Sequence, residues 1–169
     1  MRFKEIRNLI VTGLSGYLGI PVVLANQVNP EQEYPFVVYS TTATYLAENT
    51  LGDYRIEAAG AETRKEQPTS TWSFTVCSAN RRTTSGFVLG DDEAMETAEK
   101  ALGWFLHVGY DYMLKNGITI VDSGNVQERS VLQVDEEARR YGFDITIRYV
   151  REDIRQAGLI EHATATRKG

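Results

Sequence analysis

The chain has 169 residues, of which 42% are hydrophobic and 24% charged, so its composition is that of a folded globular domain and excludes a disordered chain. Its 18 Lys and Arg against 23 Asp and Glu give a formal net charge of −5, which excludes a generally basic nucleic-acid-binding protein. The single cysteine, Cys77, excludes an internal disulfide and a cysteine-rich zinc site, and its place in an apolar run indicates a small strand residue in a reducing compartment.

The first predicted element is a helix over residues 3–17, where apolar residues recur at steps of three and four and so share one face. Gly16 and Gly19 favour its end, because glycine readily adopts the left-handed cap conformation. Continuous apolar runs predict strands at 20–24 and 35–40. Neither the helix nor these runs approaches the ~20 apolar residues that span a bilayer, so no membrane contact is expected.

Residues 41–68 predict an arm rather than part of the core. Threonines at the start of this segment favour extended structure, and 49–53 has the composition of a turn. Gly60 and Pro68 interrupt any longer element. We therefore expect a protruding hairpin with little hydrophobic core of its own.

The strongest strand patterns lie at 72–77 and 141–149, where apolar and polar residues alternate at period two. Such strands have one buried and one solvent-exposed face, which favours an antiparallel sheet covered on one side. Further strands are predicted at 118–121 and 130–134, and no periodicity is present from 156 onward.

A long helix is predicted from Asp91 to Lys115, with Asp91 or Asp92 as its cap and Glu93 favourably placed near its positive end. The resulting order of elements predicts an α+β fold: a mostly antiparallel β-sheet with two helices packed on one face, plus the arm. We expect one domain over 1–155, with the arm at 41–68, and a C-terminal tail over 156–169.

No set of residues in the sequence predicts catalysis, a metal site or a cofactor. Gly13–Gly16 resembles part of a nucleophile elbow but lacks the final glycine and lies at a helix end. His107 and His162 have no ligand partner at metal-binding spacing. The basic residues Arg81–Arg82 and Arg129 are too few for a phosphate site. We therefore expect neither an enzyme nor a cofactor.

Two groups of residues are candidates for contacts between subunits. The mixed-charge cluster of Asp135, Glu136, Arg139 and Arg140 fits a solvated turn with weak ion pairs and fits equally an interlocking contact between identical subunits. The aromatic residues in the arm form the second group, since aromatic side chains are enriched at protein interfaces. The two candidates in the arm are Tyr45 and Tyr54.

Three stretches of the chain resemble a family of bacteriophage neck and tail-terminator proteins, and together they cover residues 34–150. The first two are Tyr34–Tyr39 and Glu66–Thr75. The third comprises Trp104–Phe105, Gly109–Tyr112, Asn116–Ile118, Gly124–Val126, Arg129 and Arg139–Ile145.

This resemblance implies a structural virion protein that forms a ring, commonly a hexamer, at the head-proximal end of the tail tube. Such a ring stops tube polymerisation and joins the tail to the head connector. The implied partners are further copies of the chain, the tail tube protein and connector or stopper proteins, and the implied location is the virion, with assembly in the host cytoplasm. The family has an α/β sandwich fold and no catalytic residues to transfer.

DNA that passes through such a ring would meet the arm, so acidic residues there are candidates for lining the lumen without binding DNA. These residues are Glu48, Asp53, Glu57 and Glu62. Two other functions remain open: a head–tail connector or stopper in the same neck, and a small ligand-binding α+β domain, which would require a deep pocket with converging polar groups.

Overall fold

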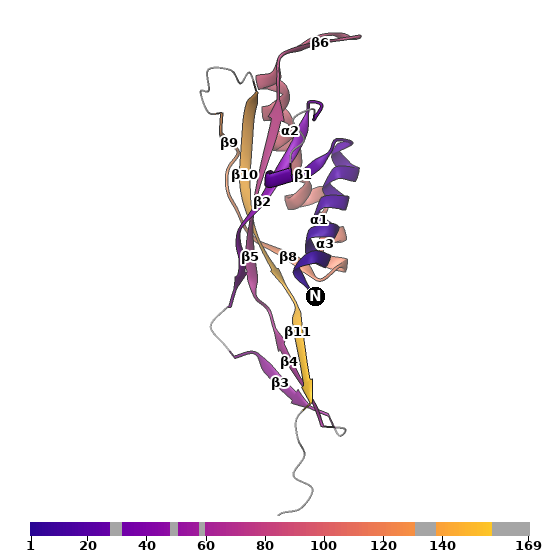
Figure 1. Ribbon diagram of the computed structural model, residues 1–169, viewed down its shortest axis with the longest axis vertical. Helices are drawn as coiled ribbons and strands as arrows, with labels where there is room; N and C mark the ends of the chain where they lie inside the picture. The colour runs from indigo at the N-terminus through magenta and orange to yellow at the C-terminus, as the bar shows by residue number, and fades with distance from the viewer. Residues whose placement is uncertain (28–31, 48–50, 58–59, 131–137, 157–169) are drawn as a thin grey trace, which may run out of the picture.

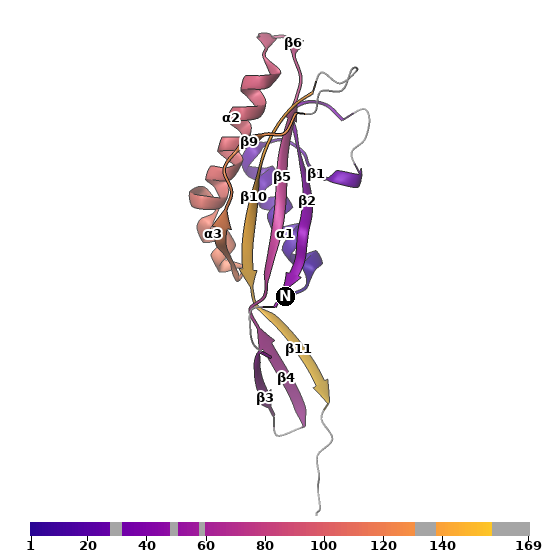
Figure 2. The same cartoon turned by 90° about the vertical axis from the view of Figure 1, so that its left-hand side faces the viewer.

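A computed structural model describes residues 1–27, 32–47, 51–57, 60–130 and 138–156 (Figure 1). The molecule is elongated, with an α+β body and a narrow β-arm that extends from one end (Figures 1 and 2). This arrangement confirms the predicted α+β fold, its mostly antiparallel sheet and its protruding arm.

The body contains a six-stranded sheet whose main path has the order β1–β2–β5–β10–β8, with β9 paired to β10. Its strands are β1 (Val22–Leu24), β2 (Phe36–Leu46), β5 (Thr69–Ser78), β10 (Arg139–Tyr149), β8 (Ile118–Ser123) and β9 (Gln127–Glu128). All neighbours are antiparallel except β1 and β2, which run parallel. The parallel pair is possible because a long connection, part of it the short 3-10 helix η1 (Ala25–Gln27), separates the two strands.

The two period-two strands of the sequence, β5 and β10, form the centre of this sheet. They pair in register from Thr69–Arg148 to Ser78–Arg139. On the dry face, Phe74 lies 5.7 Å from Phe143 and 4.9 Å from Phe105 between ring centroids. The opposite face is polar: Arg129 donates hydrogen bonds to Ser73 Oγ and Asp144 Oδ1 at 2.6 and 3.0 Å.

The helices cover one face of the body sheet, as predicted (Figures 1 and 2). They are α1 (Phe3–Leu18), α2 (Gly90–Gly103), the π-helical turn η2 (Trp104–Val108) and α3 (Tyr110–Lys115). Ile6, Ile10 and Leu14 on α1 and the alanines of α2 pack into the same core as Trp72. The small side chains of α2 let that helix sit close to β5 and β10.

The single helix predicted for 91–115 is interrupted, which corrects that prediction. The π-helical turn η2 adds a residue to the helical turn and redirects the chain before α3. Gly109 allows this path, because a Cβ at Gly109 would lie 2.4 Å from the indole of Trp104. Val108, at the end of η2, is 55% exposed.

The predicted cap of this helix is also wrong. The helix begins one residue earlier than expected, with Leu89 at the N-cap and no side-chain cap. Asp91 and Asp92 lie in the first turn, where negative charge still interacts favourably with the helix dipole.

The arm is a separate three-stranded sheet in the order β11–β4–β3. It comprises β3 (Asp53–Ile56), β4 (Ala61–Glu66) and β11 (Arg151–Gln156). A hairpin was predicted within 41–68, but with its turn at 49–53, which is wrong: residues 41–46 belong to β2 of the body sheet, and the hairpin is formed by β3 and β4. β11 was not predicted, because its charged residues have no hydrophobic period. β11 follows directly from β10, so the central strand of the body continues into the arm.

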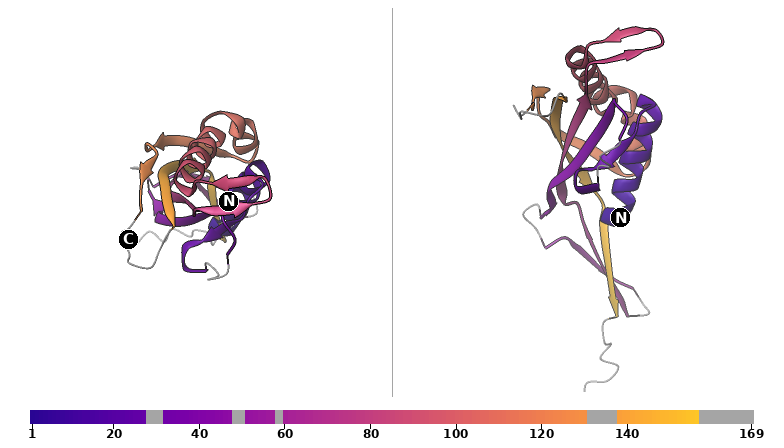
Figure 3. Two further views of the ribbon diagram at one scale, coloured as in Figure 1. Left: turned by 90° about the horizontal axis from the view of Figure 1, so that it is seen from above. Right: turned by 45° about the horizontal axis from the view of Figure 1, so that its top comes forward.

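A second hairpin, formed by β6 (Arg81–Thr83) and β7 (Gly86–Val88), projects from the opposite end of the molecule (Figure 3). No pattern in the sequence predicted this hairpin. The strand predicted at 130–134 falls outside the described residues except for Ser130, which lies in no strand.

Candidate assembly surfaces

The arm has two outer edges that another chain could pair with. β4 is central and is paired on both sides, with β3 over 53–56 and with β11 over 151–156. Within the described part of the chain, no strand pairs with the outer edge of β3 or of β11. Each edge therefore presents unpaired backbone N–H and C=O groups, the feature that allows strand addition.

Opposite charges face each other along β4 and β11. The ion pairs are Arg155–Glu62 (2.8 Å), Arg64–Asp153 (3.7 Å), Arg151–Glu66 (3.7 Å) and Lys65–Glu152 (3.2 Å). A pair whose two partners are both exposed, such as Lys65–Glu152, contributes at most about 1 kcal/mol, because water screens it. Their main effect is to fix the register of the two strands, since a shift by one residue would place each charge on the wrong face.

The large apolar side chains of the arm are exposed. Leu51 is 79% exposed, Tyr54 53%, Ile56 63% and Ile154 70%. Within the described residues, no helix or second sheet covers either face of the arm (Figures 1 and 2). A small sheet without a covered face gains little from hydrophobic burial, so the arm is the part of the described fold most in need of a partner.

The arm joins the body at a buried carboxylate. Glu66 is only 8% exposed and accepts hydrogen bonds from Tyr45 Oη at 2.9 Å and Arg64 Nη2 at 2.6 Å. The guanidinium of Arg151 lies over the ring of Tyr45, 5.2 Å from its centroid. These contacts join β2, β4 and β11 at one point, so they set the direction in which the arm leaves the body.

Three of the four predicted lumen residues are described, and they do not lie on one face of the arm. Asp53 shares a row with Lys65, whereas Glu62 lies three residues from Lys65 and therefore on the opposite face. Glu62 is also buried and bonded to Arg155. Asp53 and Glu57 are exposed, and Glu48 lies outside the described residues.

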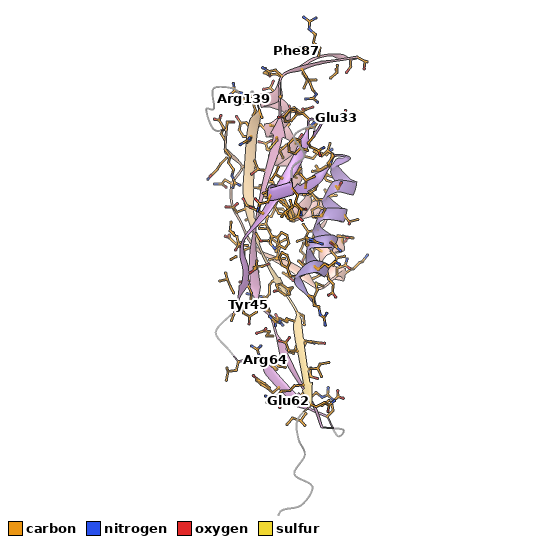
Figure 4. All side chains as sticks on the ribbon, viewed as in Figure 1. Glu33, Tyr45, Glu62, Arg64, Phe87 and Arg139 are labelled. Atoms are coloured by element: carbon orange, nitrogen blue, oxygen red, sulfur yellow. The ribbon has the colours of Figure 1, made fainter. Side chains whose placement is uncertain are left out.

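The predicted interface residues do not come together: Tyr45 lies near the arm and Arg139 near the opposite end of the body (Figure 4). Tyr54 is exposed on the edge strand β3, whereas Tyr45 belongs to the junction of arm and body. Arg139 and Arg140 begin β10 at the other end, where Arg139 is exposed and the backbone N–H of Arg140 donates to Ser130 Oγ at 3.1 Å. Asp135 and Glu136 lie outside the described residues.

The β6–β7 hairpin forms an apolar surface that sequence reasoning missed. Phe87 is 65% exposed and Leu89 46%. The base of the hairpin is fixed by Arg81, which donates to both carboxylate oxygens of Glu93 at 2.6 and 2.8 Å. The only local signal was the polar run ending in Gly86 between Arg82 and Phe87, which has the composition of a turn.

A further apolar ridge follows the outer side of η2 and α3. Leu106, Tyr110 and Leu114 recur every four residues and are 51%, 49% and 50% exposed. His107 is exposed on the same segment. Together with the arm and the hairpin, this ridge gives the described molecule several apolar contact surfaces.

Two hollows lie on the described surface. One of about 380 Å³ lies between α1 and β1 and is lined by apolar side chains, including Val11 and Val22, together with the polar side chains of Arg7, Asn8 and Gln27. Another of about 270 Å³ lies on the arm beside Tyr54 and Arg155. Among the described residues, no three metal-ligating side chains come together. No described helix combines the length and hydropathy needed to cross a bilayer.

One comparison with known proteins gives a match that covers most of the chain. The family described as phage neck terminator protein matches residues 8–166, which include the body from within α1 onward, the arm and the β6–β7 hairpin. The comparison with curated proteins found no match.

Proposed function

Because the chain belongs to the phage neck terminator protein family, we propose that six copies of it form a ring that caps the head-proximal end of the tail tube and joins the tail to the head connector. The family is one of structural proteins of the phage neck, so the protein is a virion component. The ring, its copy number and its partners are the parts of this statement that are proposed.

The observation that supports a ring most directly is the uncovered arm. Its edge strands β3 and β11 differ from each other, so pairing one with the other between copies gives a heterologous contact. A heterologous contact that repeats around an axis closes into a ring when the rotation per copy divides a full turn.

The two ends of the molecule supply surfaces for different partners. The arm and the β6–β7 hairpin lie at opposite ends of the long axis (Figure 3). In a ring with this axis along the tail, one end meets the tail tube and the other meets the connector. Phe87 and Arg139 are both exposed at the hairpin end. Both are therefore candidates for the contact with whichever partner, tail tube or connector, meets that end.

We place the arms around the lumen, with Asp53 and Glu57 on the wall. Negative side chains repel phosphate groups, so DNA would slide past them without being held. Glu62 contributes less to such a wall, because Arg155 neutralises it.

The test is to determine the mass of the purified protein by native mass spectrometry, alone and mixed with purified tail tubes, and to locate it in the virion by electron cryomicroscopy. A six-copy ring on one end of the tubes is expected. A ring found only on the head side, away from the tube, would make the protein a connector or stopper. A deep site with a bound small molecule would overturn the structural role altogether.

A further inference from the structure

We infer that neighbouring copies join through a parallel strand pair, β3 of one copy with β11 of the next, in which Arg55 lies beside Glu152. This inference rests on the proposed ring and specifies the contact that closes it. The first step is strand direction. β3 and β11 are both antiparallel to β4, so they run in the same direction, from the body toward the tip of the arm.

Copies in a cyclic ring all point the same way along its axis. If the arm strands lie along that axis, β3 of one copy and β11 of the next also run in the same direction. The junction is therefore parallel, whereas the pairs within each arm are antiparallel. Continued around the ring, the three-stranded arms would form one closed barrel, which leaves no free strand edge.

The second step is the register of the junction. Side chains that lie side by side in a sheet point to the same face, so only even offsets keep the two faces of the arm continuous from copy to copy. Within one arm, Lys65 on β4 has Asp53 on β3 and Glu152 on β11 as its direct cross-strand neighbours, and we call such a set a row. If rows continued across the junction without an offset, Asp53 of one copy would lie beside Glu152 of the next. Like charges directly opposite each other destabilise a strand pair, so this register is disfavoured.

A shift of β3 by two residues toward the body, relative to β11 of the next copy, removes this contact between like charges. It places Arg55 beside Glu152, an opposite-charge pair, and Tyr54 beside Arg151, where a cation–π contact can form. The same offset in the other direction places Asp53 beside Ile154 and leaves no opposite-charge pair. Closure of a sheet into a barrel also requires a stagger, which an in-register junction would not supply.

The charge balance of the arm supports this register. The row of Lys65 contains Asp53 and Glu152 and so carries one excess negative charge. The row of Arg55 contains Thr63 and Ile154 and carries one excess positive charge. Among the described residues Arg55 has no ion-pair partner, and the side chain of Glu152 remains 48% exposed beside Lys65. With the two-residue offset, the row with excess positive charge in one copy continues into the row with excess negative charge in the next copy.

Cysteine cross-linking tests the register. In the double variant Arg55→Cys/Glu152→Cys, oxidation should link successive copies into a ladder of covalent multimers. The two positions within one copy are separated by β4, at about 10 Å, which is too far for a disulfide. The wild type, whose single cysteine Cys77 is buried, should give no ladder. The matched control is Asp53→Cys/Glu152→Cys, whose cysteines would lie side by side only in a junction without an offset. This variant should therefore also form no ladder of covalent multimers.

Charge reversal tests the pairing. Arg55→Glu and Glu152→Arg should each lower the fraction of rings at least tenfold, whether measured alone or on tail tubes. Mixing the two variants should restore rings in which they alternate, because each β3 then meets an opposite charge on the next β11. Lys4→Glu, a charge reversal on the exposed side of α1 and outside both the arm and the hairpin, is the control and should leave the ring fraction within twofold.

The outcomes separate the junction from the ring itself. A ladder from the Asp53 control, or failure of the mixture to restore rings, would overturn the Arg55–Glu152 register. Wild-type rings without any ladder from either double variant would overturn the β3–β11 junction and leave the proposed function standing. Absence of wild-type rings both alone and on tail tubes would overturn the proposed function.

Discussion

Single glycines decide how closely the helices approach one another. Gly13 on α1 faces the aromatic side chains of Trp104 and Tyr112, and a Cβ there would lie 2.7 and 2.8 Å from their ring atoms. Tyr112 Oη also donates to the carbonyl oxygen of Leu9 at 3.2 Å. The contact between α1 and the η2–α3 segment therefore depends on the absence of a side chain at Gly13.

Gly13→Ala should destabilise the protein by about 1–3 kcal/mol, because the added methyl group overpacks a rigid aromatic contact. Gly16→Ala is the matched control on the same helix. It has nothing within 4 Å of the new Cβ, so the higher helix propensity of alanine should stabilise it by up to about 1 kcal/mol. Urea unfolding followed by circular dichroism measures both, and equal effects of the two substitutions would contradict the packing argument.

Glu93 joins the base of the β6–β7 hairpin to the first turn of α2. Hydrogen bonds from the Arg81 guanidinium, together with one from Ser78, hold the pKa of Glu93 below its usual range despite the opposing effect of burial. Its ionised form is therefore favoured in the folded state. Stability from this group is fully present above about pH 4.3, the pKa in an unfolded chain, and is lost as pH falls through the lower folded pKa.

Replacing Glu93 with Gln should reduce the free energy of unfolding at pH 7 by about 1.5 kcal/mol, the value for hydrogen bonds to a charged group. The difference in unfolding free energy between wild type and E93Q should shrink as pH is lowered from 5 to 3. Acid neutralises the Glu93 carboxylate of the wild type, whereas the glutamine of the variant has no charge to lose. Urea titrations at several pH values measure this difference. A gap that stays constant over this range would show that the ion pair with Arg81 does not stabilise the fold.

At the scale of elements, the two sheets differ in what holds them together. The body sheet is covered by helices and contains Trp72, Phe74 and Phe143, all fully buried. The described part of the arm has backbone hydrogen bonds and ion pairs, but no helix or second sheet covers it. Local opening free energies follow buried apolar contact, so the arm should open far more easily than the body.

In the isolated protein, backbone amides of β3, β4 and β11 should exchange with deuterium at least tenfold faster than those of β5 and β10. Assembly into the ring should slow exchange in β3 and β11, whose outer edges become paired, and should leave the central β5 unchanged. Hydrogen exchange with mass spectrometry measures both effects. An arm as protected as the body in the monomer would contradict the view that it lacks stability of its own.

The strength of the local pattern determined which elements could be predicted. β5 and β10 alternate strictly between apolar and polar residues, so each pattern indicates both the strand and its buried face. β11 has the sequence Arg-Glu-Asp-Ile-Arg-Gln, with no hydrophobic period, and its partners lie more than 80 residues away at Glu62 to Glu66. The interruption at η2 was also missed, because the helical apolar spacing continues through it.

At the scale of the whole molecule, the net charge is negative. It amounts to −5, and the charged side chains of β4 and β11 form ion pairs with each other. Long-range attraction to DNA is therefore weak at every ionic strength.

The protein should show no saturable binding to duplex DNA at about 0.15 M salt, an ionic strength at which charges separated by more than about 8 Å are screened. Fluorescence anisotropy of a labelled 30-base-pair duplex, titrated with the protein to 100 μM, measures this. Reversal of Asp53 and Glu57 to Lys should create measurable, salt-sensitive binding in the ring. Binding by the wild type at this salt would contradict a lumen that lets DNA slide.

Local patterns in the chain predict the α+β class, the central strands, the helical cover and the presence of an arm, because each depends on a hydrophobic period or on nearby turn residues. Three features became known from the folded chain alone: β11 completes the arm, Glu62 and Asp53 lie on opposite faces, and Phe87 lies at the other end. These features depend on the pairing of polar strands distant in sequence. Ion pairs between two polar strands do not require a regular hydrophobic spacing in either strand, so neither sequence indicates the pairing.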